Sequence, residues 1–143
     1  MIIRAFKADD LNDVMDIWLN TNIKAHSFIN ENYWISNYEL VRSQYIPNST
    51  TYVHEDEGKV NGFLSIMDES FIGAIFIDSE YQSRGIGRVL INYAKEKYDK
   101  LSLAVYEENK RALEFYKREG FKVTLLQVDE ATGRKELIME WKR

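Results

Sequence analysis

The stretch 71–90 constrains the fold of this chain more than any other part of the sequence. It begins with an uninterrupted apolar run, Phe71–Ile77, which predicts a strand buried on both faces, because a half-buried strand alternates apolar and polar residues. A short polar link leads to the glycine-rich segment 84–88. Apolar residues then recur at the spacing of one helix face, at Ile86, Val89, Leu90, Tyr93 and Ala94. The stretch therefore predicts a strand, a glycine turn and a helix in direct succession.

The glycine turn of residues 84–88 predicts a phosphate-binding site. Free backbone N–H groups in the first turn of a helix lie at the positive end of its dipole and bind phosphate. Gly85 and Gly87 allow positive φ angles and close approach of a ligand to the backbone. The alternative is a plain tight connection between strand and helix. A P-loop is excluded because its Gly-Lys-Ser/Thr ending is absent, and the third glycine of a dinucleotide fingerprint is missing as well.

The rest of the chain predicts one α/β domain spanning 1–143, because no linker, repeat or low-complexity segment divides it. Further strands are predicted at Ile2–Phe6, Thr51–His54, Lys59–Met67, Leu101–Val105, Phe121–Val128 and Glu136–Trp141. Helices are predicted from Asp9 or Asp10 to a break near Thr21–Ser27, over Trp34–Tyr45 ahead of Pro47, from Gly87 to about Tyr98, and from an Asn109 N-cap to Gly120. This order indicates a mostly antiparallel mixed sheet with one central strand–helix–strand crossover and helices on both faces.

Charge and cysteine content exclude several kinds of partner and site. The chain carries 19 basic and 23 acidic residues, a net charge of −4, which argues against a nucleic-acid or anionic-membrane partner. Without cysteine it forms neither disulfides nor thiolate metal sites, and His26 and His54 are too isolated in sequence for a zinc site. The N-terminus lacks the apolar core of a signal peptide, and no apolar run approaches a transmembrane span. A cytoplasmic protein without a metal is expected.

Two motifs together give the chain a family resemblance. Gln82-Ser-Arg-Gly85-Ile-Gly87 follows the predicted strand directly and is similar to the acetyl-CoA motif, Gln/Arg-x-x-Gly-x-Gly/Ala, of the GNAT superfamily of N-acetyltransferases. Asn109 and Tyr116 stand in the next predicted helix, ahead of a Gly-Phe pair at 120–121, as in the second motif of that family. The resemblance covers essentially the whole chain and implies the GNAT fold, with acetyl-CoA as the cosubstrate.

The resemblance implies an acetyl-CoA site in which most contacts come from the backbone. The amides of the loop hold the pyrophosphate, and the open backbone of the predicted strand Phe71–Ile77 pairs with the pantetheine arm like an added strand. The side chains of Arg84 and Arg88 either add charge near the phosphates or are simply solvated. The implied cofactor-binding residues are Ile75, Phe76, Ile77, Gln82, Ser83, Arg84, Gly85, Ile86, Gly87, Arg88 and Asn109.

By the same resemblance Tyr116 is the general acid that protonates the leaving thiolate of CoA. A phenol suits this role because it is protonated at neutral pH and its ring is rigid. The alternative is that Tyr116 only packs beside Phe115 and Leu113. Asn109 is expected to contact the CoA arm, and as a helix N-cap it can serve both purposes.

The proton acceptor for the substrate amine is not evident from the sequence. Several relatives carry a glutamate five residues before the motif asparagine, where this chain has Ala104. The candidates to replace it are Glu69, Glu107 and His26. A relayed water, or an amine that arrives already deprotonated, would also suffice. With Ala104 at the position of that glutamate, no single carboxylate is expected to be indispensable, and deprotonation is expected to run through ordered water.

The acceptor itself also stays open at the level of sequence. The resemblance implies transfer to a primary amine by direct attack, either of a protein lysine or of a small molecule. The first half of the chain, 25–34, is similar to a subgroup of small bacterial GNAT proteins presumed to acetylate protein lysines. The residues expected to bind the acceptor are His26, Phe28, Glu69 and Phe71. The alternatives are a catalytically weak acyl-CoA-binding regulatory module and, more remotely, a nucleotide-handling domain; the oligomeric state, monomer or homodimer, is open too.

Overall fold

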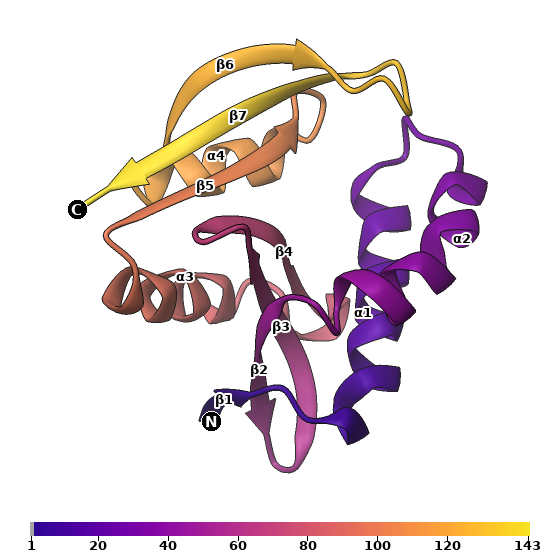
Figure 1. The fold of residues 1–143 in the computed structure, drawn as a ribbon, viewed down its shortest axis with the longest axis vertical. Coiled ribbons are helices and arrows are strands. Elements are labelled where there is room, and N and C mark those ends of the chain that lie inside the picture. Colours follow the sequence, from indigo (N-terminus) through magenta and orange to yellow (C-terminus); the bar gives the residue numbers. More distant parts are fainter. Residues whose placement is uncertain (1) are drawn as a thin grey trace.

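The computed structural model describes residues 2–143, which form a seven-stranded sheet with helices on both faces (Figure 1). The strands are β1 (Ile2–Ala5), β2 (Thr50–Asp56), β3 (Lys59–Met67), β4 (Phe71–Ile77), β5 (Lys100–Tyr106), β6 (Lys122–Val128) and β7 (Lys135–Lys142). The helices are α1 (Leu11–Ala25), α2 (Glu31–Leu40), α3 (Ile86–Lys97) and α4 (Lys110–Arg118). Shorter helical turns are η1 (Ala8–Asp10), η2 (Val41–Tyr45) and η3 (Ser79–Tyr81).

The strand order is β1-β2-β3-β4-β5-β7-β6. Neighbouring strands are antiparallel, except that β4 and β5 run parallel and are joined by a crossover through α3. A parallel connection needs such a crossover, because a tight turn can only reverse the chain. The structure thus confirms the mostly antiparallel mixed sheet with a central strand–helix–strand unit.

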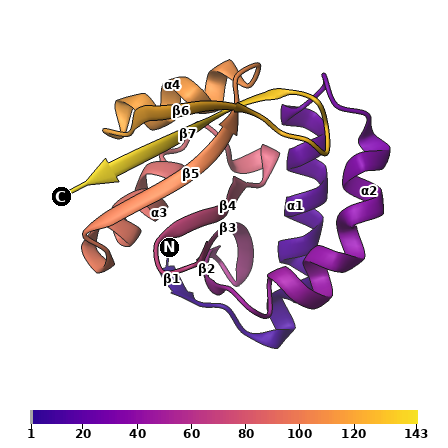
Figure 2. The ribbon, with the colours of Figure 1, turned by 45° about the horizontal axis from the view of Figure 1, so that its top comes forward.

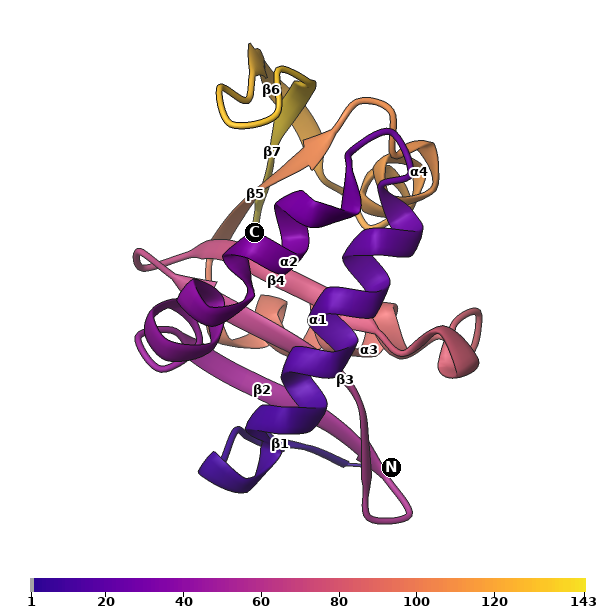
Figure 3. The same ribbon diagram turned by 90° about the vertical axis from the view of Figure 1, so that its right-hand side faces the viewer.

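Two apolar cores lie on opposite faces of the sheet. Successive side chains of a strand point to opposite faces, and in β3 Phe63 packs with the residues of α1 and α2 while Leu64 packs with those of α3. Figure 3 shows α1 and α2 lying across one face of β2–β4. The amphipathic pattern of α3 is confirmed, because Leu90 and Ile91 are fully buried in the core that contains Leu64.

The predicted burial of β4 on both faces is wrong. Along its length β4 pairs with β3, but it pairs with β5 only at Phe71 and Ile72. Beyond Ile72 the two parallel strands diverge, so Gly73 is exposed and the residues up to Ile77 are half-buried. The apolar run therefore forms the wall of an opening in the sheet instead of a central buried strand.

One helix boundary and one capping interaction differ from the sequence prediction. The break predicted near Thr21–Ser27 begins too early, because α1 continues to Ala25. Its polar residue Asn22 is buried inside the helix, where its amide donates to the carbonyl of Trp18 (2.8 Å). Asp10 does occupy the N-cap position, but its carboxylate accepts from the Arg4 guanidinium (2.8 Å) and the Lys7 N–H (2.7 Å) instead of from the helix.

Candidate active site

The divergence of β4 and β5 opens a cleft of about 1050 Å³. Its walls are β4, the outer half of β5, the first turn of α3, one side of α4 along its length, and the end of α1. The cleft therefore lies at the carboxyl end of a parallel strand pair, next to the start of the crossover helix. This is where open α/β sheets bind their ligands.

The glycine loop presents free backbone donors to this cleft. Gly85 is the N-cap of α3 with φ 81°, and Ser83 before it also has a positive φ of 64°. The first backbone hydrogen bond of α3 runs from the Val89 N–H to the Gly85 carbonyl (3.1 Å). The N–H groups of residues 86–88 precede this bond and so have no partner within the helix. They form the helix N-terminus that the sequence predicts as a phosphate site.

The side chains around the loop are only partly those expected. Ser83, Gly85, Ile86, Gly87 and Arg88 line the cleft, as does Gln82. Arg84 is not among the lining residues; its guanidinium lies 5.0 Å from the ring centroid of Tyr81.

The sequence analysis missed Arg111, a cation in the first turn of α4. Its guanidinium donates to Gln82 Oε1 (3.2 Å) and to Ser83 Oγ (3.2 Å), which joins α4 to the loop before α3. Arg111 also lines the cleft. No local pattern could have assigned this contact, because it depends on how two helices separated by a strand pack together.

The open edge of β4 offers backbone groups at alternate residues. The Asp78 N–H donates to the Asn61 carbonyl of β3 (2.9 Å), and the paired residues alternate from there along an antiparallel ladder. The backbone groups of Phe76 are therefore directed at β3, and those of Ile75 and Ile77 at the open edge. In agreement, the Ile77 carbonyl accepts a hydrogen bond from the Gln82 side chain (3.1 Å) on that side.

Tyr116 lies on α4 and lines the cleft. Its ring packs edge-on against Phe115 and Phe121, with centroids 5.3 and 5.9 Å apart. Burial raises the pKa of its phenol above the ordinary value, so the hydroxyl is protonated at neutral pH. None of the hydrogen bonds between residues 2–143 engages this hydroxyl, which leaves it available to a ligand.

His26 and Asn109 join the end of α1 to the start of α4. The Nδ1 of His26 lies 3.1 Å from the Asn22 carbonyl, which can only accept, so Nδ1 carries the proton. Its Nε2 accordingly accepts from the Asn109 amide (3.2 Å), while Asn109 Oδ1 accepts from the Ala112 N–H (3.3 Å) and caps α4. Both residues line the cleft, and their hydrogen bond joins its two sides.

The environment of His26 predicts a loss of stability in mild acid. The side chain is 6% exposed, and burial lowers its pKa from 6.5 to about 4. Between these values the unfolded chain binds a proton that the folded chain does not, so stability falls as the pH drops from the unfolded towards the folded pKa. We expect the free energy of unfolding to lose roughly 2 kcal/mol from this group between about pH 7 and about pH 4.5. Urea denaturation at both pH values measures this loss in the wild type and in His26→Gln. The two proteins share all other titrating groups, so equal losses would contradict the assignment.

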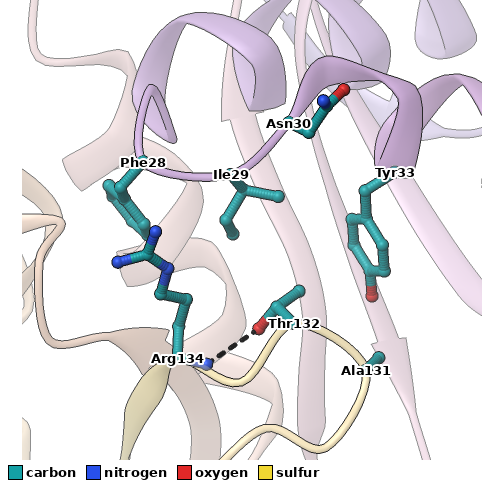
Figure 4. A pocket seen from close by; sticks show the side chains of 7 residues that line it. All are labelled: Phe28, Ile29, Asn30, Tyr33, Ala131, Thr132 and Arg134. Atoms are coloured by element: carbon teal, nitrogen blue, oxygen red, sulfur yellow. Dashed lines mark hydrogen bonds between the residues drawn. The ribbon is translucent and has the colours of Figure 1, made fainter.

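The other residues expected to bind the acceptor amine, Phe28, Glu69 and Phe71, do not lie together in the structure. Phe71 lines the cleft. Phe28 lines a smaller pocket of about 260 Å³ between the α1–α2 connection and the β6–β7 connection, two segments that approach each other in Figure 2. Figure 4 shows the Arg134 side chain rising from the β6–β7 connection over the ring of Phe28 (5.8 Å). Glu69 is exposed in the turn before β4 and lines neither space.

The side of the cleft next to α1 and α2 is aromatic, and most of its residues were not expected from the sequence. Tyr106 of β5 contacts the rings of His26 and Phe28, with centroids 5.2 and 5.8 Å away. Trp34 stacks on His26 at 5.1 Å and lines the cleft with Tyr106. The helical spacing of Trp34 predicts a core residue, and the structure confirms it, because Trp34 is buried in the core beside α1. That the same side chain also borders the cleft is not evident from the sequence.

Metal-binding clusters and membrane-spanning helices are both absent from residues 2–143. Residues 2–143 contain no group of three His, Asp or Glu side chains placed to hold a metal ion. None of the helices in this range is both long and apolar enough to cross a bilayer.

Sequence comparison relates the chain to one domain family and to lysine-modifying relatives. Residues 27–143 match the model of the acetyltransferase (GNAT) domain. The peptidyl-lysine N-acetyltransferase YiaC of Escherichia coli strain K12 is 34% identical over 140 residues, which cover 98% of this chain and 96% of that protein. The peptidyl-lysine N-acetyltransferase YjaB of the same organism is 30% identical over 122 residues, covering 85% of this chain and 82% of that protein.

Solved structures agree with the fold. The solution structure of apo YjaB from Escherichia coli superposes with a TM-score of 0.86 at 29% identity, covering 99% of this chain and 98% of that one. The spermidine N-acetyltransferase of Vibrio cholerae, solved with CoA and spermine, gives a TM-score of 0.74 at 21% identity and covers 99% of this chain and 94% of that one. The second likeness concerns the fold alone.

Proposed function

Because this chain belongs to the GNAT family of N-acetyltransferases, we propose that it transfers the acetyl group of acetyl-CoA to the side-chain amine of lysine in proteins or peptides. The observation that carries the proposal is the cleft between β4 and β5, which places a helix N-terminus, an open strand edge and a protonated tyrosine around one space. Lysine is favoured as the acceptor because the relatives YiaC and YjaB are both named peptidyl-lysine N-acetyltransferases.

The residues along the cleft fit the chemical parts of acetyl-CoA. The free N–H groups of residues 86–88 suit a pyrophosphate, and no atom lies within 4 Å of the place where a Cβ on Gly85 would stand, so the loop is open to it. The backbone groups of Ile75 and Ile77 suit the amides of the pantetheine arm, which would add to β4 as a strand adds to a sheet edge. Arg111 and Arg88 supply positive charge at the phosphate end.

In the proposed reaction the lysine amine attacks the thioester directly. The nitrogen lone pair forms a bond to the carbonyl carbon, the carbon–sulfur bond breaks, and the amine loses one proton in becoming an amide. Tyr116 gives its hydroxyl proton to the departing sulfur as the general acid, so that CoA leaves as a thiol, and the proton lost by the amine restores the hydroxyl. The raised pKa of Tyr116 keeps this donor protonated through the neutral range.

The test is acetyl transfer to a panel of amines that contains lysine peptides, spermine and free amino compounds. We expect release of the CoA thiol with lysine peptides, together with acetyl-lysine in the product. Protection of the protein by CoA against heat, without turnover of any amine, would instead support the alternative of an acyl-CoA-binding regulatory module. Turnover of spermine but not of lysine would keep the enzyme and overturn the acceptor.

A further inference from the structure

We propose that Glu136 of β7 is the general base that takes the proton from the acceptor amine. This rests on the proposed function and adds a residue that the sequence motifs do not contain. It replaces the expectation that deprotonation runs through water without an indispensable carboxylate. The proposal stands on the register of the C-terminal strands, the charges in the cleft and the hydrogen bonding of Glu136.

The register places Glu136 on the face that borders the opening of the sheet. Tyr106 of β5 lies directly opposite Glu136, and Ala104 lies opposite Ile138. Residues two apart on a strand share a face, so Ala104, Tyr106 and Glu136 share one, and all three line the cleft. Ala104 is exposed and has no polar side-chain atom. Glu136 is its diagonal neighbour, close enough for a long side chain to reach the space above the alanine.

The charges of the cleft single out the same residue. The lining includes two carboxylates, Glu119 and Glu136. Glu119 lies at the end of α4 and pairs with the Arg88 guanidinium (3.8 Å) at the phosphate end. Glu136 takes part in none of the ion pairs within residues 2–143. Its negative charge is therefore available to a cationic amine.

A neutral partner holds the carboxylate of Glu136 in place. The Gln127 amide of β6 donates to its Oε1 (2.7 Å). One donor on one oxygen leaves the second oxygen with free acceptor capacity. The arrangement orients the group without neutralising it, as a base that must bind an ammonium requires.

The candidates from the sequence are less suited to this role. Glu69 and Glu107 do not line the cleft. His26 does, but its Nδ1–H is committed to the Asn22 carbonyl and its Nε2 to the Asn109 amide. Burial lowers the pKa of His26 to about 4, which makes its ring a weak proton acceptor.

The other titratable groups around Glu136 do not compete for the proton. Tyr106 lies opposite it on β5 and donates to Asp129 Oδ2 (2.6 Å), and Tyr33 of α2 is a phenol whose pKa is raised by burial and, to a smaller extent, by the charges of Asp129 and Glu136. The pKa values of both phenols are raised, chiefly by burial, so neither accepts a proton in the neutral range. Asp129 is engaged by the Tyr106 hydroxyl.

In the proposed step the lysine enters as an ammonium, and Glu136 takes one proton and so frees the nitrogen lone pair, which then attacks the thioester carbon. The nitrogen–carbon bond forms, the carbon–sulfur bond breaks, and the sulfur leaves as a thiol with a proton from the Tyr116 hydroxyl. The second amine proton restores the Tyr116 hydroxyl, and Glu136 returns its own proton to water. The net products are the amide, CoA thiol and one released proton.

The experiment compares the pH dependence of kcat/KM for the wild type and Glu136→Gln, with a lysine peptide and with spermine. With the base present, the ammonium form of the amine reacts, so kcat/KM of the wild type changes less with pH than kcat/KM of Glu136→Gln. Without it only the neutral amine reacts, and its fraction rises about tenfold per pH unit up to the amine pKa of about 10.4. We expect Glu136→Gln to lower kcat/KM by about 10²-fold near neutral pH. The kcat/KM of the variant should then rise towards the wild-type value as the pH approaches the pKa of the amine.

Glu140→Gln is the matched control, because Glu140 lies on the same strand and face, opposite Ser102, but outside the cleft. It should keep the wild-type profile. A Glu136→Gln profile parallel to that of the wild type, whether lowered or not, would overturn the base and reduce Glu136 to a binding contact. A wild type that acetylates spermine but not the peptide would overturn lysine as the acceptor. In that case the pH profiles of kcat/KM with spermine, for the wild type and Glu136→Gln, would still test Glu136 as the base. An enzyme inactive on every amine would overturn both proposals.

Discussion

Tyr116→Phe is expected to lower turnover by about 10²-fold or more, because it removes the one group proposed to protonate the leaving thiolate. The ring stays in its contacts with Phe115 and Phe121, so packing should change little. Acetyl-CoA affinity should be nearly unchanged, since the hydroxyl acts mainly in the transition state. Steady-state turnover with a good amine acceptor, together with calorimetric titration of acetyl-CoA, separates the two effects.

Tyr98→Phe provides the matched control for this measurement. Tyr98 also packs against the core beneath α3 and also has its pKa raised by burial, but it lies outside the cleft. We expect it to keep wild-type turnover. If Tyr116→Phe matches the wild type under conditions in which chemistry limits the rate, Tyr116 is a packing residue and not the acid.

Arg88→Pro is expected to weaken acetyl-CoA binding by about 10- to 100-fold. Proline removes the N–H of residue 88, one of the free donors at the start of α3, and a hydrogen bond to a charged group is worth about 1.5–3 kcal/mol. The helix should survive, because the first backbone bond is donated by Val89 and the first turn tolerates proline. Gly87 before it lacks the Cβ that would otherwise clash with the ring.

Arg88→Ala separates the backbone donor from the side chain. The guanidinium is 73% exposed and only loosely paired with Glu119, so its loss should cost a few-fold in affinity at most. Titration calorimetry with acetyl-CoA compares the two variants, and circular dichroism confirms that α3 is intact. Equal affinities for the proline and alanine variants would mean that the amide does not hold the phosphate. Substituting Gly87 would be less informative, because its Cβ would stand 3.2 Å from the Phe115 ring, next to Tyr116.

The elements of the fold were largely predictable because they depend on local patterns. The apolar spacing of α3, the Asn109 cap of α4 and the glycine turn between strand and helix each depend on a few neighbouring residues, and the structure confirms them. The parallel pairing of β4 with β5 agrees with the predicted crossover, because parallel strands cannot be joined by a tight turn. The Gly85 conformation agrees with the predicted loop.

The parts that were not predictable depend on contacts between distant segments. The divergence of β4 from β5 cannot be predicted from the apolar sequence Phe71–Ile77, because a strand that borders a ligand cleft is as apolar as a buried one. The contacts of Arg111 with the glycine loop and of Glu136 with the cleft arise from packing across the sheet. The bond between His26 and Asn109 joins residues far apart in the chain, so each looked like an isolated side chain in the sequence.

The short pairing of β4 with β5 has a mechanical consequence. The sheet consists of two halves, each firmly hydrogen-bonded within itself, that share only two residue pairs. So short a pairing of β4 with β5 does little to fix the angle between the two halves. That angle depends instead on side-chain packing and on hydrogen bonds across the cleft, such as the one between His26 and Asn109. A molecule lying in the opening touches both halves and supplies contacts that this short pairing omits. The rigidity of the whole molecule is therefore coupled to ligand binding in the cleft, because a bound ligand restrains the angle between the two halves of the sheet.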